Sequence, residues 1–307
     1  MRATFEPIFL QRGAGPHTAR MAVLRQPATG AARALVVQVH AFAEEMNKTR
    51  RMAALQAEAL AERGCAVLQI DLLGCGDSDG DFGDATWTEW IDDVEFACHW
   101  LVERTAGTAA AASSAPNAPL WLWGVRTGCL LAAQAAARLP WPAHMLFWQP
   151  VTVGKSALQQ FLRLKAAADM LRGQSQGVTE RLRAEIAAGR SVEVAGYRLS
   201  PGLCLGLDGA LLTPPPKAGT ASWFEVASRP ESGPTPAAQR AAQSWSDAGW
   251  QVQTTTVAGP AFWQSTEIEE APALVEASAE AVAPATVPSR QPGRDAPRPA
   301  IEAERQV

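Results

Sequence analysis

The chain has 307 residues, of which 47% are hydrophobic and 19% are charged, and its net charge is −4. This composition is typical of a soluble globular protein, and the acidic balance argues against nucleic-acid binding, which requires a basic face. Five scattered cysteines without a CxxC pair predict neither a disulfide framework nor a metal site. No apolar run approaches the roughly 18 residues of a membrane helix, and residues 1–13 lack the pattern of a secretory signal. We therefore expect a cytoplasmic protein with no cofactor and no stable membrane insertion.

Short apolar segments alternate with helical patterns along the first half of the chain. The apolar segments are typical of buried parallel strands and cover residues 34–40, 65–71, 120–123 and 144–149. Between them, apolar residues recur at helical spacing over residues 47–63, 86–104 and 128–138. Residues 105–117, rich in Ala, Ser and Thr, predict a long surface loop. Repeated strand–helix units predict a mainly parallel central sheet flanked by helices.

The pattern changes after residue 150. Residues 156–171 and 178–188 are predicted as helices and residues 191–199 as a hairpin arm, so we expect an inserted cap over about residues 151–215. The alternation resumes with strands at 221–226 and 250–257 around a helix at 236–248. Residues 271–307 contain six prolines and no sustained period, which predicts a disordered tail after an α/β domain of residues 1–270.

Two glycine-containing turns follow predicted strands. DLLGCGDS at residues 71–78 follows one strand, and GVRTG at residues 124–128 connects another strand to a helix, with glycines two residues on either side of Arg126. In parallel sheets, ligands bind beyond the carboxyl ends of the strands. The loops after residues 40, 71, 123 and 149 are therefore where we expect the chemistry.

Spaced in this way, the two turns resemble the framework of the α/β-hydrolase superfamily. Within it, HAFAEEMNK at residues 40–48, GVRTG at 124–128 and GPAFWQ at 259–264 resemble the type 2 exosortase A system-associated hydrolases. The resemblance covers about residues 3–272. It implies a cytoplasmic protein of a bacterial exopolysaccharide and protein-sorting system, with a protein partner there, and it implies a nucleophile on the elbow, an acid and a histidine.

The residues at these three positions depart from that pattern. Arg126 stands at the centre of the elbow, and a guanidinium stays protonated and cannot attack a carbonyl. The four histidines are at positions 17, 40, 99 and 144, so none follows the last predicted strand, where Phe262 and Trp263 stand instead. Glu231 is the candidate at the place of the acid.

Two interpretations of Arg126 remain open. It pairs with Glu44, Glu45 or Asp71 and closes a former active site, or it clamps the carboxylate or phosphate of a small ligand. His40 either holds its loop by hydrogen bonding or acts as a general base assisted by Glu44 or Glu45. The residues expected to line the ligand pocket are Arg126, His40, Phe42, Val125, Thr127, Phe262 and Trp263.

The sequence thus predicts a non-catalytic or accessory protein that binds a small anionic ligand at the former active site. The alternative is an active hydrolase of an ester or other acyl substrate that uses water activated by His40 or a carboxylate. His40, Glu44 and Glu45 are the candidate catalytic residues of that alternative.

Overall fold

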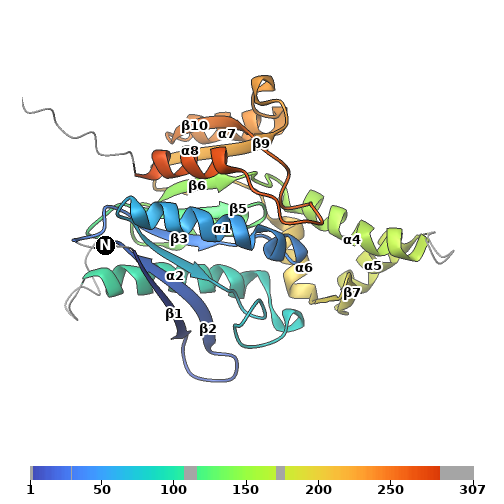
Figure 1. Ribbon diagram of the computed structural model, residues 1–307. Helices are drawn as coiled ribbons and strands as arrows, with labels where there is room; N and C mark the ends of the chain where they lie inside the picture. The colour runs from blue at the N-terminus through green and yellow to red at the C-terminus, as the bar shows by residue number, and fades with distance from the viewer. Residues whose placement is uncertain (1–2, 29, 107–115, 171–176, 284–307) are drawn as a thin grey trace, which may run out of the picture.

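The computed structural model describes residues 3–28, 30–106, 116–170 and 177–283. Its centre is an eight-stranded sheet with the strand order β1-β2-β4-β3-β5-β6-β9-β10 (Figure 1). The strands are β1 (Thr4–Gln11), β2 (Ala19–Gln26), β3 (Leu35–Val39), β4 (Ala66–Ile70), β5 (Leu120–Val125), β6 (His144–Trp148), β9 (Thr220–Ala227) and β10 (Gln251–Ala258).

Six strands of this sheet, from β4 to β10 in the strand order, pair in parallel, as the sequence predicts. The antiparallel hairpin of β1 and β2 joins the sheet through β4 and adds an edge that the sequence patterns did not predict. Its first strand alternates exposed and half-buried positions and includes Pro7, so it lacks the continuous apolar run of the central strands.

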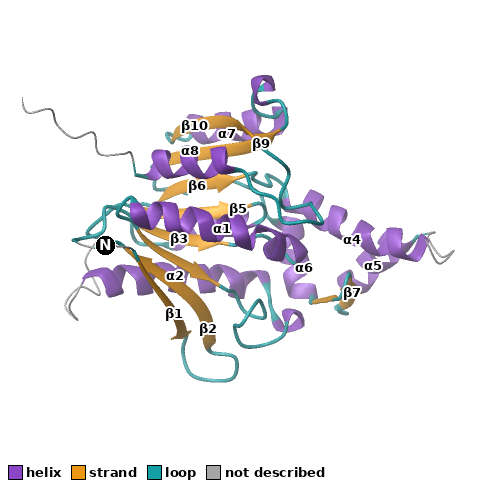
Figure 2. Ribbon diagram, viewed as in Figure 1, coloured by secondary structure: helices purple, strands orange, loops and turns teal. Residues whose placement is uncertain are grey.

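Helices cover both faces of the sheet (Figure 2). One face packs against α1 (Glu44–Glu62) and α8 (Pro272–Val282), around a core of small apolar side chains with Trp123 and Trp148. The other face packs against α2 (Trp87–Ala106), α3 (Gly128–Arg138) and α7 (Pro236–Asp247). Short 3-10 turns lie at Phe82–Asp84 and Pro230–Ser232. Within the described ranges, we find no helix that combines the length and apolar character needed to cross a membrane.

Between β6 and β9 the chain leaves the sheet at the carboxyl ends of the strands (Figure 1). This region, which we call the cap, consists of α4 (Gly154–Met170), α5 (Val178–Ala187), β7 (Val192–Val194), β8 (Tyr197–Leu199) and α6 (Pro201–Gly209). It closes at its base by a bridge between Val153 and Leu211. Aromatic rings pack the cap against the loops of the sheet. The ring centres of Phe161 in α4 and Phe42 are 5.1 Å apart, and those of Tyr197 and Phe82 are 4.9 Å apart.

The structure corrects the expectation that residues from 271 onwards form a disordered tail. Helix α8 starts at Pro272, which occupies the first helical turn, where a missing N–H group costs little. Its Leu274 and Val282 are buried, and Trp148 donates a hydrogen bond to Ser278 at 2.8 Å. The prolines that suggested disorder lie before and after this buried stripe. Residues 284–307 of the predicted tail and residues 107–115 of the predicted loop lie outside the described residues.

Candidate functional site

Arg126 lies on a sharp bend between β5 and α3, as the spacing of the glycines predicts. Its φ angle is +56°, a left-handed conformation that L-residues rarely adopt. A Cβ atom on Gly124 would lie 2.6 Å from the Cα atom of Cys129, and one on Gly128 would lie 2.3 Å from the carbonyl oxygen of Val39. The close approach of backbone on both sides therefore requires glycine at these two positions.

Protein groups surround the guanidinium of Arg126. Its Nε atom lies 3.2 Å from both carboxylate oxygens of Glu45, and its Nη2 atom lies 3.2 Å from Oε1 of the same residue. Nη1 donates to the carbonyl oxygen of Gln149 at 3.2 Å, and the guanidinium carbon lies 5.3 Å from the centre of the Trp263 ring. The Arg126 and Glu45 side chains are 14% and 26% exposed, so water screens this ion pair weakly.

Glu44 and Glu45 begin α1, and their side chains have different partners. Glu45 binds Arg126, whereas Glu44 accepts a hydrogen bond from the hydroxyl of Tyr197 in the cap at 3.2 Å. Asn47 donates to the same hydroxyl at 3.2 Å. Burial, together with the nearby Glu44 charge, raises the pKa of Tyr197 to about 12, so its hydroxyl stays protonated and donates. Tyr197 thereby connects the cap to α1.

A cavity of about 320 Å³ lies above Arg126, between the start of α1, the elbow and α4 of the cap. We call it the elbow cavity. Among the predicted ligand-binding and catalytic residues, the structure brings six of them to its wall. Its lining consists of Phe42, Glu44, Glu45, Lys48, Arg126, Thr127, Val151, Ala157, Gln160, Phe161, Leu164, Trp263 and Gln264.

The lining of the elbow cavity, taken over the described residues, contains no serine, cysteine or histidine. Cys129, the thiol closest in sequence to the elbow, is buried and donates to the carbonyl oxygen of Trp148 at 3.9 Å. Burial raises its pKa far above the usual value, so it stays an uncharged, unreactive thiol. Groups of three or more metal-ligating side chains that could hold an ion are also absent among the described residues.

His40, which the sequence places among the residues of the ligand pocket, does not line the elbow cavity; of its two interpretations, the geometry fits the one in which it holds its loop. His40 is 5% exposed, and its Nδ1 atom donates to the carbonyl oxygen of Ala41 at 2.8 Å. Its Nε2 atom accepts a hydrogen bond from the backbone N–H of Leu72 at 3.3 Å. Burial lowers the pKa of His40, an effect partly offset by the charge of Asp71. The ring is thus neutral and holds two loops together, and it lines a different cavity.

Three further predicted residues do not reach the elbow cavity. Val125 and Phe262 are almost completely buried in the core that packs against α1 and α8, so the position after the last strand supplies Trp263 alone. Glu231, the candidate acid, is exposed in the Pro230–Ser232 turn. The buried carboxylate near that turn belongs to Glu225 of β9, which accepts hydrogen bonds from the backbone N–H and the hydroxyl of Thr235.

Sequence reasoning missed the residues that the cap and the end of β6 contribute. Phe161 and Leu164 form the apolar wall opposite Arg126, and their helical periodicity alone could not show which face meets the sheet. Gln149 has a φ angle of +44°, and its side chain accepts from the backbone N–H of Val226 at 2.8 Å. Nothing in the sequence marks Gln149 as the carbonyl partner of Arg126.

Comparison with known proteins is consistent with this geometry. The model of the serine aminopeptidase S33 family matches residues 30–184 of this chain. Similar solved structures include Est1E from Butyrivibrio proteoclasticus with bound ferulic acid, which is 18% identical with a TM-score of 0.58 and covers 85% of this chain and 93% of its own. A putative hydrolase from Agrobacterium vitis S4 is 16% identical with a TM-score of 0.54, and the match covers 91% of this chain and 98% of the hydrolase.

Carboxyl esterase 2 from Tuber melanosporum is a third similar structure, 15% identical with a TM-score of 0.54 and covering 92% of this chain and 85% of its own. Identities this low establish a common fold and leave activity open. A search among curated proteins gives no significant match.

Proposed function

The chain belongs to the serine aminopeptidase S33 family of α/β hydrolases, and from this premise we propose that it is a binding protein that uses the hydrolase fold without hydrolysis. The ion pair between Arg126 and Glu45 at the elbow carries this proposal. Acyl transfer on this fold requires a nucleophilic side chain at the bend and a base beside it. A guanidinium has no lone pair for attack, and the sequence has no histidine beyond residue 144.

The lining of the elbow cavity supports a ligand with two chemically different ends. Phe42, Phe161 and Leu164 offer an apolar wall, whereas Arg126 and Lys48 offer cationic groups at the base and rim. A carboxylate or phosphate of the ligand can take the place of Glu45 on Arg126, because both make the same bidentate contacts. Such an exchange of one carboxylate for another is nearly neutral in free energy. The apolar part of the ligand must therefore provide most of the affinity.

The geometry gives no support to the alternative of a hydrolase that activates water through His40. Both ring nitrogens of His40 are engaged by backbone groups, and the ring lines another cavity. Glu45 is occupied by Arg126, and Glu44 accepts from Tyr197. We therefore favour a non-catalytic or accessory role. The resemblance of residues 40–48, 124–128 and 259–264 supports our proposal that this role belongs to a bacterial exosortase and exopolysaccharide system in the cytoplasm.

Calorimetric titration with hexanoate, with acetate as the probe that lacks the apolar part, tests the binding function. We expect hexanoate to bind the wild type more tightly than acetate, and Arg126→Ala to weaken hexanoate binding by about tenfold or more, because the ligand's carboxylate loses its cationic partner. Glu45→Gln removes the internal competitor while it preserves the shape of the side chain, so we expect it to tighten hexanoate binding by about tenfold.

A matched control is Arg51→Ala, which should leave hexanoate affinity unchanged. Arg51 lies on α1, the helix of Glu45, but it pairs with the exposed Glu270 outside the cavity. Equal hexanoate affinity in wild type, Arg126→Ala and Glu45→Gln would refute the proposed clamp. Weaker binding in Glu45→Gln would also refute it, because that result would make Glu45 a ligand contact and not a competitor.

A further inference from the structure

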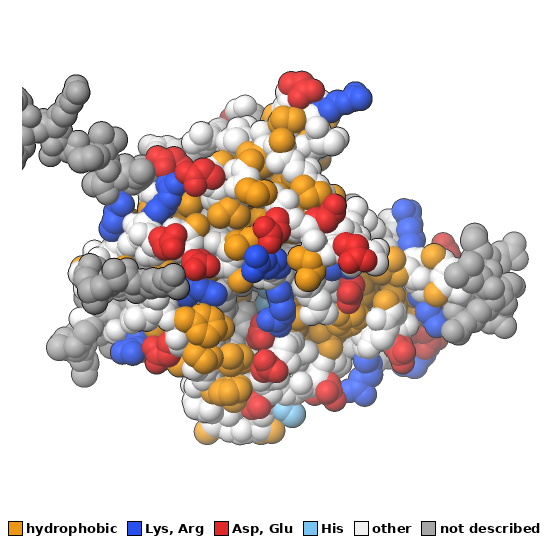
Figure 3. Space-filling view, in the orientation of Figure 1, with side chains coloured by type: hydrophobic (Ala, Val, Ile, Leu, Met, Phe, Trp, Pro, Cys, Tyr) orange, Lys and Arg blue, Asp and Glu red, His pale blue; other side chains and the backbone are white. Residues whose placement is uncertain are grey.

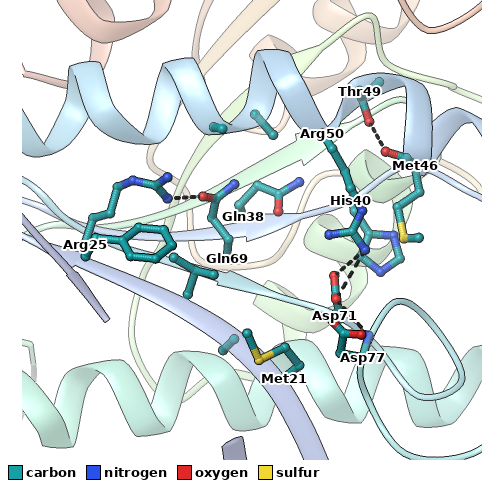
Figure 4. A pocket seen from close by; sticks show the side chains of 15 residues that line it. Met21, Arg25, Gln38, His40, Met46, Thr49, Arg50, Gln69, Asp71 and Asp77 are labelled. Atoms are coloured by element: carbon teal, nitrogen blue, oxygen red, sulfur yellow. Dashed lines mark hydrogen bonds and ion pairs between the residues drawn. The ribbon is translucent and has the colours of Figure 1, made fainter. Parts of the chain in front are cut away.

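A second cavity, of about 330 Å³, lies between α1 and the part of the sheet formed by β2, β4 and β3 (Figure 4). We call it the sheet cavity. Among the described residues, none lines both this cavity and the elbow cavity. Its walls combine Phe5, Met21, Val23 and Met46 with a polar floor of Gln38, Gln69 and Arg25. The proposed function of the elbow cavity uses none of these residues.

Gln38 is the most informative residue of this floor. It lies in β3, a strand whose other residues are apolar, and it is 4% exposed. Within the part of the chain that the structure describes, its amide makes no hydrogen bond, although the residue lines the cavity. Its amide atoms are not among the fully enclosed polar atoms that lack a partner, so the amide is open to the cavity. It therefore offers a hydrogen-bonding group to a molecule in the cavity from a strand that is otherwise apolar.

Gln69 and Arg25 extend the polar floor across the neighbouring strands. Gln38 pairs with Gln69 in the parallel register of β3 and β4, which directs both side chains to the α1 face. Arg25 donates from Nη1 to the Oε1 atom of Gln69, so the Nε2 atom of Gln69 keeps its N–H groups free for another acceptor. Figure 4 shows the three side chains side by side beneath α1.

Arg25 differs from the other charged residues at this cavity. Arg50 pairs with Asp71 at 3.2 Å, so its charge is balanced. Arg25 forms no ion pair with a carboxylate of the described residues, and Glu58 acts on it only as a nearby charge. The guanidinium carbon of Arg25 lies over the Phe5 ring, 5.0 Å from the centre of the ring. Within the described residues, Nε and Nη2 of Arg25 donate to no protein group, so they are available to an oxyanion.

We propose that the sheet cavity is a second ligand site that binds a small hydroxylated molecule carrying an oxyanion, a carboxylate or a phosphate. Arg25 holds the oxyanion through its free in-plane N–H groups. The amides of Gln38 and Gln69 bind hydroxyl groups, which can both accept from and donate to an amide. The volume suits a molecule of the size of a sugar acid.

The surface around the cavity is consistent with this class of ligand. Hydrophobic side chains gather over the β1–β2 hairpin on the face that α1 covers in part (Figure 3). Phe5 of β1 is 62% exposed and also lines the cavity. An exposed aromatic ring beside hydrogen-bonding amides provides a surface for the C–H groups of a polyhydroxylated chain, and its exposure leaves the site accessible from solvent.

Three probes separate the parts of this proposal in calorimetric titrations. Gluconate carries both hydroxyls and a carboxylate, sorbitol carries hydroxyls alone, and acetate carries the carboxylate alone. We expect gluconate to bind the wild type at least about tenfold more tightly than either of the others. Sorbitol loses the charge-assisted hydrogen bonds of the carboxylate and acetate loses those of the hydroxyls, and one charge-assisted or two neutral hydrogen bonds contribute roughly this much affinity. No binding at millimolar gluconate, or equal binding of sorbitol or acetate, would overturn the proposal.

Variants locate the site. Arg25→Gln and Gln38→Leu should each weaken gluconate binding about tenfold or more. Arg240→Gln, an exposed change on α7, should leave it unchanged. Circular dichroism confirms folding, and Gln38→Leu is a conservative test because it replaces a buried amide with an apolar group of similar size. Gluconate binding retained in both Arg25→Gln and Gln38→Leu would contradict the assignment.

Discussion

The ion pair between Arg126 and Glu45 should stabilise the fold by a measurable coupling free energy. Charges about 4 Å apart attract by about 4 kcal/mol at an effective dielectric constant near 20. Both side chains are less than one-third exposed, so much of that attraction is offset by the loss of hydration. We expect a net coupling of about 2 kcal/mol in the free energy of unfolding.

A double-mutant cycle with Arg126→Gln, Glu45→Gln and the double variant measures this coupling by urea unfolding. Arginine and glutamine both place a Cβ atom at the positive φ angle of residue 126. The substitution therefore removes the charge and leaves the backbone strain of the bend nearly unchanged. Each single variant leaves one charge without its partner and should lose about 2 kcal/mol, whereas the double variant should lose less than the sum of the two.

The pair between Arg51 and Glu270 provides the matched comparison. Its distance is 2.8 Å, but its side chains are 54% and 40% exposed, so we expect a coupling below about 1 kcal/mol. If the pair at the elbow couples no more strongly than this exposed pair, then Arg126 and Glu45 do not form the stable interaction on which the proposed function rests.

Two further predictions concern the backbone at the elbow and the buried imidazole. Gly128→Ala should destabilise the fold by about 3 kcal/mol in urea unfolding, because its Cβ atom would lie 2.3 Å from the carbonyl oxygen of Val39, whereas Gly209→Ala, with open space around it, should not destabilise it. Because burial lowers the pKa of His40, the unfolded chain takes up its proton first, and stability should fall as the pH drops below about 6.5. His40→Gln should make this fall shallower; an unchanged slope in His40→Gln would show that His40 is not held neutral.

The alternation of apolar strands and amphipathic helices was sufficient to predict the central part of the fold. Gly128–Arg138 forms the helix α3 with the predicted bounds, and the strands on either side differ from their predicted ends by one or two residues. These elements are buried on both sides, so their apolar patterns are continuous. The β1–β2 hairpin and α8 lie at the periphery, where exposed positions and prolines weaken the same signal.

The site was predictable where it depends on the local chain and not where it depends on packing between distant segments. The glycines around Arg126 indicated the bend, and the charge of Arg126 indicated as its partner either an acidic side chain or an anionic ligand. In the structure Glu45, one of the three candidate side chains, pairs with it. The direction of the His40 ring depends on Ala41 and Leu72, and its position after a strand was compatible with either cavity. The polar floor of the sheet cavity depends on the unpredicted strand β2, which supplies Arg25.

The most direct test of the central claim is whether any acyl or phosphonyl group becomes attached to this protein. Incubation with a fluorophosphonate probe and with p-nitrophenyl butyrate, followed by intact-protein mass spectrometry and rapid-mixing absorbance, measures this for the wild type and Arg126→Ser. Our account predicts an unmodified mass and no burst of p-nitrophenol in both, since even a serine at residue 126 would have no imidazole to activate it. A stoichiometric adduct or a burst of p-nitrophenol in the wild type would contradict it.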